Sequence, residues 1–272
     1  MKKLIKFPNE YLGNGKIGAI HYKFAKYLLS EIKEFEIETF DSSLDIWPSF
    51  KINDKIIMFD YQDFKSLNEN YNNVDICLKT QYTSDLENID NVFPWSQVSF
   101  LDWSYFHNLR SLINYKAKGN LIINNQKPYG NAKQRRLKVK NLLQSTYRNN
   151  VSTKPDMNQT KFFKQINDCL VYVHVPGYSN NMLDRAHVQM FAFGCCVITT
   201  NIPNILPNGL KPIPGEHYIQ CNDDYSDLIQ LIQWCKNNRD ECVRIGNNAK
   251  ILFNNSLTPQ SVNTHLKNIL KI

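Results

Sequence analysis

Apolar and polar residues alternate along this chain in blocks that predict strands and helices in turn. Residues 169–175 form an apolar, β-branched run closed by Pro176-Gly177, which is typical of a buried strand. Apolar residues then recur at helical spacing through residues 182–192, Phe193-Gly194 ends that helix, and residues 195–200 predict a second buried strand. Such a βαβ unit predicts a parallel sheet whose ligands lie at the carboxyl ends of the strands.

The same pattern extends over the rest of the chain. Apolar runs predict further strands at residues 3–7, 35–40, 55–60, 74–79, 98–102, 119–124 and 217–221. Periodic stretches predict helices at residues 19–32, 132–144, 161–168, 225–238, 239–253 and 258–272, the last with Thr258 as its N-cap and Pro259 at its first position. The chain is therefore predicted to be α/β, with two Rossmann-like domains whose parallel sheets are flanked by helices.

A glycine-rich loop precedes the first predicted helix. Gly13, Gly15 and Gly18 match the spacing of a dinucleotide-binding loop. The loop starts several residues after the strand, however, and no acidic residue stands convincingly where the ribose would be bound. An NAD-dependent oxidoreductase is therefore only a minor alternative.

Composition and charge narrow the class of protein. The 272 residues are 42% hydrophobic and 12% aromatic, as in a folded globular chain, and the net charge of +7 is not concentrated in a tail. This charge suits an anionic small ligand and is weaker than expected for a dedicated nucleic-acid binder. No apolar stretch resembles a signal peptide or a membrane span, and the seven cysteines lie mostly in apolar patterns. We expect reduced thiols, a cytoplasmic location, no membrane span and no nucleic-acid partner.

Short motifs in the second half of the chain occur in a recognisable order. They are Gly177, Asp184-Arg185, the turn and strand from Phe193 to Ile198, Pro-Gly-Glu-His-Tyr-Ile at residues 214–219, and Asp-Asp-Tyr-Ser-Asp-Leu at residues 223–228. This order resembles the donor-binding half of GT-B glycosyltransferases, with the nearest likeness to the protein O-glucosyltransferase-like and spore-coat glycosyltransferase-like families. The likeness covers residues 121–253.

The resemblance implies a domain organisation. Residues 1–116 would form an N-terminal acceptor domain, residues 117–257 a nucleotide-sugar donor domain, and residues 258–272 a helix that packs back on the first domain. The glycine loop at Gly13, Gly15 and Gly18 would then line the acceptor side of the cleft.

The resemblance also implies which residues bind the donor. Backbone N–H groups and the helix dipole at the loop 176–181 favour an anion such as a phosphate, and a guanidinium near the helix start can hold two of its oxygens. Many members of the resembled class place a glutamate on this helix to bind the ribose, whereas this chain has Gln189. The expected donor-binding residues are Gly130, Arg135, Arg136, Gly177, Tyr178, Asn181, Arg185, Gln189 and His217.

The implied reaction is transfer of a sugar from a nucleotide sugar, expected to be a UDP-sugar, to a glycan or glycoprotein acceptor. We expect inversion at the sugar, no metal, and no cofactor beyond the co-substrate, because arginines and helix ends compensate charge in this class and no Asp-x-Asp motif occurs. An inverting enzyme needs a base in the first domain, and Asp60, His21 and Asp102 are the candidates. A non-catalytic module that binds nucleotides or sugars remains the alternative.

Overall fold

The chain folds into two compact units, each described here by itself. The computed structural model describes residues 3–8, 26, 29, 30, 32, 35–40, 49–52, 55–63, 65–95, 103–154 and 159–271. Unit 1 comprises residues 1–106, 204–211 and 255–272, and unit 2 comprises residues 107–203 and 212–254. The domain boundaries expected from the sequence stay a prediction.

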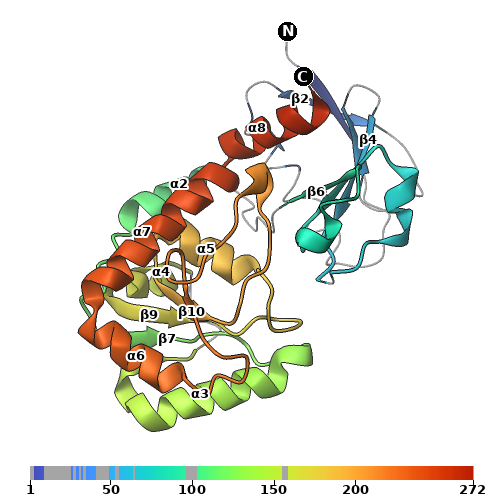
Figure 1. Ribbon diagram of the computed structural model, residues 1–272. Helices are drawn as coiled ribbons and strands as arrows, with labels where there is room; N and C mark the ends of the chain where they lie inside the picture. Colours follow the sequence, from blue (N-terminus) through green and yellow to red (C-terminus); the bar gives the residue numbers. More distant parts are fainter. Residues whose placement is uncertain are drawn as a thin grey trace. The chain divides into compact units, whose positions relative to one another are not determined.

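Unit 1 contains a six-stranded sheet in the order β2-β1-β3-β4-β5-β6 (Figure 1). Its strands are β1 (Lys3–Pro8), β2 (Phe35–Phe40), β3 (Ser49–Ile52), β4 (Lys55–Asp60), β5 (Ile76–Lys79) and β6 (Val92–Pro94). Strand β3 runs antiparallel to both of its neighbours, and the other pairs are parallel. The strands predicted at 3–7, 35–40, 55–60 and 74–79 are confirmed, whereas β3 and β6 lie where none was expected. The predicted strand at 98–102 and most of the helix at 19–32 lie outside the described residues.

The core of unit 1 combines aromatic rings with a C-terminal helix. Phe59 stacks on Phe50 and contacts Trp95, with ring centroids 4.9 and 5.2 Å apart. Helix α8 (Pro259–Leu270) begins at Thr258, whose hydroxyl accepts the backbone N–H of Ser261, so the predicted N-cap is confirmed. Its buried His265 donates to the Pro94 carbonyl at 2.9 Å, which ties α8 to the end of β6.

Unit 2 contains a five-stranded sheet in the order β11-β10-β9-β7-β8, and all of its strands are parallel. They are β7 (Leu121–Ile123), β8 (Val151–Ser152), β9 (Cys169–Val173), β10 (Val197–Thr199) and β11 (Ile219–Gln220). Every residue of β9 is buried, as the apolar run predicts. Helices α3 (Lys133–Tyr147) and α6 (Leu228–Asn237) cover one face, and α4 (Gln159–Asp168) and α5 (Arg185–Phe193) cover the other (Figure 1).

The part of the chain that the structure describes has further helices. They are α2 (Trp103–Leu112), α7 (Arg239–Ser256) and the 3-10 turns η1 (Glu69–Asn73), η2 (Ser84–Leu86), η3 (Gly130–Ala132), η4 (Arg148–Asn150) and η5 (Pro207–Gly209). The predicted class, α/β with mainly parallel sheets flanked by helices, is confirmed. None of the helices among the described residues combines the length and apolar character that crossing a membrane requires. All seven cysteines are buried and free.

Candidate functional site

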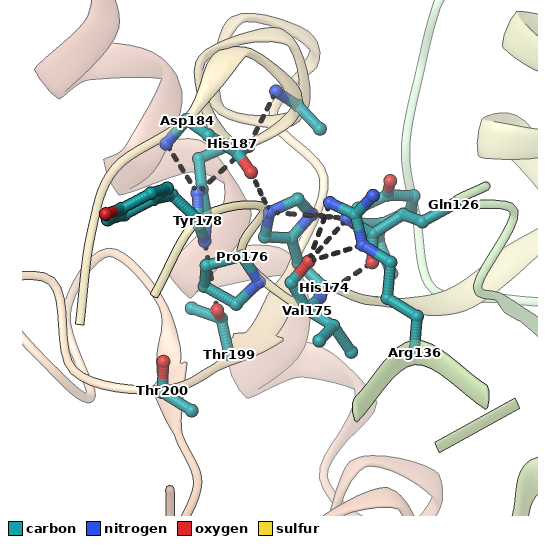
Figure 2. A network of polar contacts seen from close by, with 12 residues as sticks. Gln126, Arg136, His174, Val175, Pro176, Tyr178, Asp184, His187, Thr199 and Thr200 are labelled. Carbon is teal, nitrogen blue, oxygen red and sulfur yellow. Dashed lines mark hydrogen bonds and ion pairs between the residues drawn. The ribbon is translucent and has the colours of Figure 1, made fainter. Parts of the chain in front are cut away.

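The carboxyl ends of β7, β9 and β10 meet at one edge of the unit 2 sheet. Because these strands are parallel, the residues that follow them lie side by side there. Gln126 follows β7, His174 and Val175 follow β9, and Thr200 follows β10. Figure 2 shows the polar contacts that join these ends.

The backbone of Val175 is held from two sides. The Gln126 side chain accepts the Val175 N–H at 2.7 Å and donates to its carbonyl at 2.8 Å. Arg136 donates to the same carbonyl through Nε and Nη2, at 3.2 and 3.1 Å, and to the Lys127 carbonyl through Nη1. The loop that begins at Pro176 therefore starts from a fixed position.

His174 connects this clamp to helix α5. Its Nδ1 accepts a hydrogen bond from Gln126 Nε2 at 2.9 Å, and its Nε2 donates to Asp184 Oδ2 at 2.8 Å. Burial lowers the pKa of His174 to about 4, so the ring is neutral at neutral pH. Burial alone would raise the pKa of Asp184, but the contacts with His174 and His187 hold it well below its usual value.

Asp184 is also the N-cap of α5. Its Oδ1 accepts the N–H of Ala186 at 3.0 Å, and its own N–H donates to His187 Nδ1 at 3.1 Å. His187 Nε2 then donates to the Thr199 hydroxyl at 3.0 Å. Since the Asp184 carboxylate already occupies this helix start, the backbone N–H of Ala186 is not free for the phosphate that the sequence analysis expected there.

His174, Asp184 and His187 each present one possible ligand atom within 4.8 Å of the others, a spacing that could hold a metal ion. The hydrogen bonds of the two histidines, however, conflict with binding of a metal through these atoms. A metal on His174 Nε2 would require a ring with no proton, because Nδ1 already accepts from Gln126. A metal on His187 Nδ1 would displace the Asp184 N–H that this atom accepts. The geometry favours a hydrogen-bonded cluster, and the absence of a metal from the reaction stays a prediction.

The loop after β9 holds polar atoms that lack partners. Arg135 Nη2 donates to the Pro176 carbonyl at 3.2 Å, but its Nε is buried and unbonded. Asn180 and Asn181 donate through their amides to Asp223, while their Oδ1 atoms are buried and unbonded. Buried atoms without partners are rare in native proteins. The described part of the chain has seven such side-chain atoms, and three of them belong to this loop and to Arg135, which bonds to it. A ligand bound at this loop could supply the missing hydrogen-bond partners.

Arg185 is the first residue of α5, and its side chain is exposed. Among the residues that the structure describes, it makes no hydrogen bond or ion pair. Its neighbour Asp184 bonds to both histidines instead. Arg185 therefore has a free guanidinium, four residues along the chain from Asn181.

The other expected donor-binding residues lie at several places in unit 2. Tyr178 is exposed on the same loop, and a Cβ on Gly177 would lie 3.4 Å from Arg136 Nη2, so little room exists there. Gly130 opens η3 with a φ of +55°. Gln189 is partly buried in the second turn of α5. His217 precedes β11, at the opposite end of the sheet, where its Nδ1 accepts the Ile213 N–H at 3.0 Å.

The predicted catalytic residues belong to unit 1, and only Asp60 is described. Its buried carboxylate pairs with Lys79 Nζ at 3.0 Å and accepts the N–H groups of Asn68 and Gln62 at 2.9 and 3.2 Å. Burial lowers the pKa of Lys79, and Asp60 opposes that shift. These contacts give Asp60 a structural task, and its catalytic role stays a prediction. His21, Asp102, Gly13, Gly15 and Gly18 lie outside the described residues.

Sheets rich in parallel strands and flanked by helices, with polar groups gathered at a carboxyl edge, define the α/β class to which GT-B glycosyltransferases belong. Solved structures that share this fold include a protein from Anabaena and one from Thermosynechococcus elongatus. HepE from Anabaena, solved in complex with UDP and glucose, matches with a TM-score of 0.54 at 11% identity, covering 100% of both chains. A sucrose-phosphate synthase from Thermosynechococcus elongatus matches with a TM-score of 0.50 at 12% identity, covering 79% of this chain and 67% of the other. At these identities the likeness is one of fold.

A curated protein gives a more local match. An uncharacterised protein, 179R, of Invertebrate iridescent virus 6 is 30% identical in an alignment of 95 positions that covers 32% of this chain. The match spans 8% of the length of that relative. No family model matches the chain.

Proposed function

We propose that this chain is a glycosyltransferase that binds a nucleotide sugar, of the UDP class, at the carboxyl edge of the unit 2 sheet. The proposal is carried by the unpaired Arg185 guanidinium at the start of α5 together with the loop of residues 176–181, whose Asn180 and Asn181 leave buried acceptors unbonded. A nucleotide sugar offers a diphosphate for the cation and hydroxyl or N–H donors for such acceptors. The fold match to HepE, solved with UDP and glucose, supports the same ligand class.

In this proposal Arg135 and Arg185 compensate the charge of the diphosphate. Arg185 is free, and Arg135 retains an unbonded Nε, whereas Arg136 is committed to backbone carbonyls. During transfer the acceptor hydroxyl forms a bond to the anomeric carbon, and the bond from that carbon to the β-phosphate oxygen breaks. The departing UDP gains negative charge, so cations placed there stabilise the transition state more than the ground state.

The acceptor is proposed to be a glycan or protein hydroxyl. Its proton would pass to a base from unit 1, for which Asp60, His21 and Asp102 remain the candidates, in a metal-independent, inverting reaction.

A second function is favoured by one pair of observations. Gln189 stands where a ribose-binding carboxylate was expected, and Asp60 is committed to Lys79. A module that binds a nucleotide sugar without transferring it would fit both.

Calorimetric titration with UDP, GDP, CDP, ADP and NAD tests the binding proposal. We expect binding of UDP, and a loss of at least about tenfold in affinity in Arg185→Ala, because a charge-assisted pair of hydrogen bonds to the diphosphate is removed. Arg244→Ala is the matched control, since that arginine lies in the same unit on α7 and pairs with Glu241 at 2.8 Å. Equal affinities in wild type and Arg185→Ala, or no binding of any nucleoside diphosphate, would contradict the donor site.

Hydrolysis of UDP-sugars separates the enzyme from the binding module. A glycosyltransferase is expected to release UDP slowly onto water and faster with an acceptor glycan, whereas a module would bind the sugar nucleotide and leave it intact. Release of UDP is followed by anion-exchange chromatography, with Arg185→Ala as the control for contaminating activity.

A further inference from the structure

A chain of hydrogen bonds with a single possible direction crosses the carboxyl edge of unit 2. It runs from the backbone of Val175 through Gln126 and His174 to Asp184 at the start of α5 (Figure 2). His174 is completely buried in the middle of this chain. Nothing in the proposed reaction needs its proton, so another reason is required for a titratable ring at this position.

The direction of the chain follows from Gln126. Its Oε1 must face the Val175 N–H and its Nε2 must face the Val175 carbonyl, so the amide cannot be flipped. The same Nε2 points at His174 Nδ1, which must therefore be the unprotonated nitrogen. The proton then resides on Nε2 and is donated to Asp184. Each group can play only one part, so the arrangement specifies one position for the carboxylate.

We propose that His174 is a positioning residue, which holds Asp184 and with it the first turn of α5, so that Arg185 is presented to the diphosphate. The inference rests on the proposed function, because the ligand that Arg185 would meet is the proposed nucleotide sugar. Asp184 connects the histidine to the helix, because its Oδ2 bonds to His174 and its Oδ1 accepts the N–H of Ala186. Arg185 lies between Asp184 and Ala186 in the sequence. Loss of the His174 contact frees the carboxylate to turn away from the cluster, or to pair with Arg185.

Two substitutions test the roles of the two ring nitrogens of His174 separately. In His174→Gln the amide nitrogen stands at the same distance along the side chain as Nε2, so the donor to Asp184 is kept and the acceptor for Gln126 is lost. In His174→Asn the oxygen stands where Nδ1 was, so the acceptor is kept and the donor to Asp184 is lost. His265→Asn is the matched control, because His265 is also buried, accepts from the Asn208 N–H and donates to the Pro94 carbonyl, but belongs to unit 1.

The affinity for UDP is measured by calorimetry in wild type, the three histidine variants, Arg185→Ala, and the double variant His174→Asn/Arg185→Ala. We expect His174→Asn to bind about tenfold more weakly, and His174→Gln and His265→Asn to stay within about threefold of wild type. The double variant should bind no more weakly than Arg185→Ala alone, because the histidine acts through the arginine. A His174→Asn variant that is folded by circular dichroism and binds UDP like wild type would overturn the inference, as would additive losses in the double variant.

A measurement without ligand keeps this inference separate from the proposed function. Nitrogen-15 NMR of the imidazole rings reports which nitrogen carries the proton. His174 is expected as the neutral Nε2–H form. In Asp184→Ala the ring should keep this form, because Gln126 still donates to Nδ1, and the protonated Nε2 resonance should shift because its carboxylate acceptor is gone. A wild type with this signature that binds no nucleoside diphosphate would refute the proposed function, and with it the role of His174 toward Arg185, while the hydrogen-bonded chain itself would stand. An Nδ1–H or doubly protonated ring at neutral pH would overturn the inference even if UDP binds.

Discussion

Arg135 and Arg136 are neighbours in the sequence, yet their guanidinium groups have different tasks. The basic helix pattern could not tell which of the two would face a ligand. Arg136 is buried and bound to the carbonyls of Val175 and Lys127, whereas Arg135 keeps a bonding position open. The difference arises because consecutive residues on a helix point about 100° apart, and only the neighbouring loop decides what each one meets. Sequence could name the pair, but the contacts were needed to separate them.

The buried ion pair between Asp60 and Lys79 leads to a testable prediction about stability. Both side chains are completely buried, so Lys79→Met leaves the Asp60 carboxylate without its counter-charge. We expect a loss of about 3 kcal/mol or more in the free energy of unfolding, measured with urea. Adding Asp60→Asn to Lys79→Met should recover part of that loss, because the buried charge is then gone. Stability equal to wild type in Lys79→Met would show that the pair contributes little to unit 1.

The elements that sequence predicted best are those with long apolar runs and clear ends. Strands β9 and β10 and helix α5 were found because Pro176-Gly177 and Gly194 punctuate them. Strands β3, β6 and β8 were missed because they are two to four residues long and of mixed composition, so their pairing partners define them rather than their own pattern. Gln126 and His174 were missed for the same reason: β7 lies beside β9 in the sheet order, and this brings together residues 48 positions apart.

Helix α7 packs closely on the turn after α5, and this contact leads to a testable prediction about stability. A Cβ added at Gly246 would lie 2.0 Å from the carbonyl oxygen of Gly194, closer than any real contact. Gly246→Ala should therefore push the helix away and lower the free energy of unfolding by about 1–3 kcal/mol, although alanine favours helix by itself. Asn247→Ala, at an exposed position of the same helix, is the control and should be neutral or stabilising. Thermal unfolding compares the two, and an equally stable Gly246→Ala would mean that the close approach relaxes easily.

For the whole molecule, each unit contains a buried histidine whose ring is neutral and bonded at both nitrogens. They are His174 in unit 2 and His265 in unit 1. Burial lowers the pKa of each to about 4, from an ordinary value of 6.5. The groups around His174 partly oppose one another, because Asp184 favours the charged ring whereas His187 and Arg136 disfavour it. The two ring nitrogens of His265 bond to backbone groups, the Asn208 N–H and the Pro94 carbonyl.

These shifts predict that the protein loses stability in mild acid. Above pH 6.5 the rings are neutral in both the folded and the unfolded chain, so they do not affect the free energy of unfolding. Between pH 6.5 and 4 the unfolded chain takes up protons that the folded chain refuses, which weakens folding by up to about 3 kcal/mol for each histidine. The low pKa of Asp184 adds a further loss only below its ordinary value of 3.8. Urea unfolding at pH 7.5, 6 and 5 should therefore show a steady decline, and His265→Asn, which cannot titrate, should decline less steeply than wild type. A wild-type free energy that stays constant from pH 7.5 to 5 would mean that these rings accept protons without unfolding.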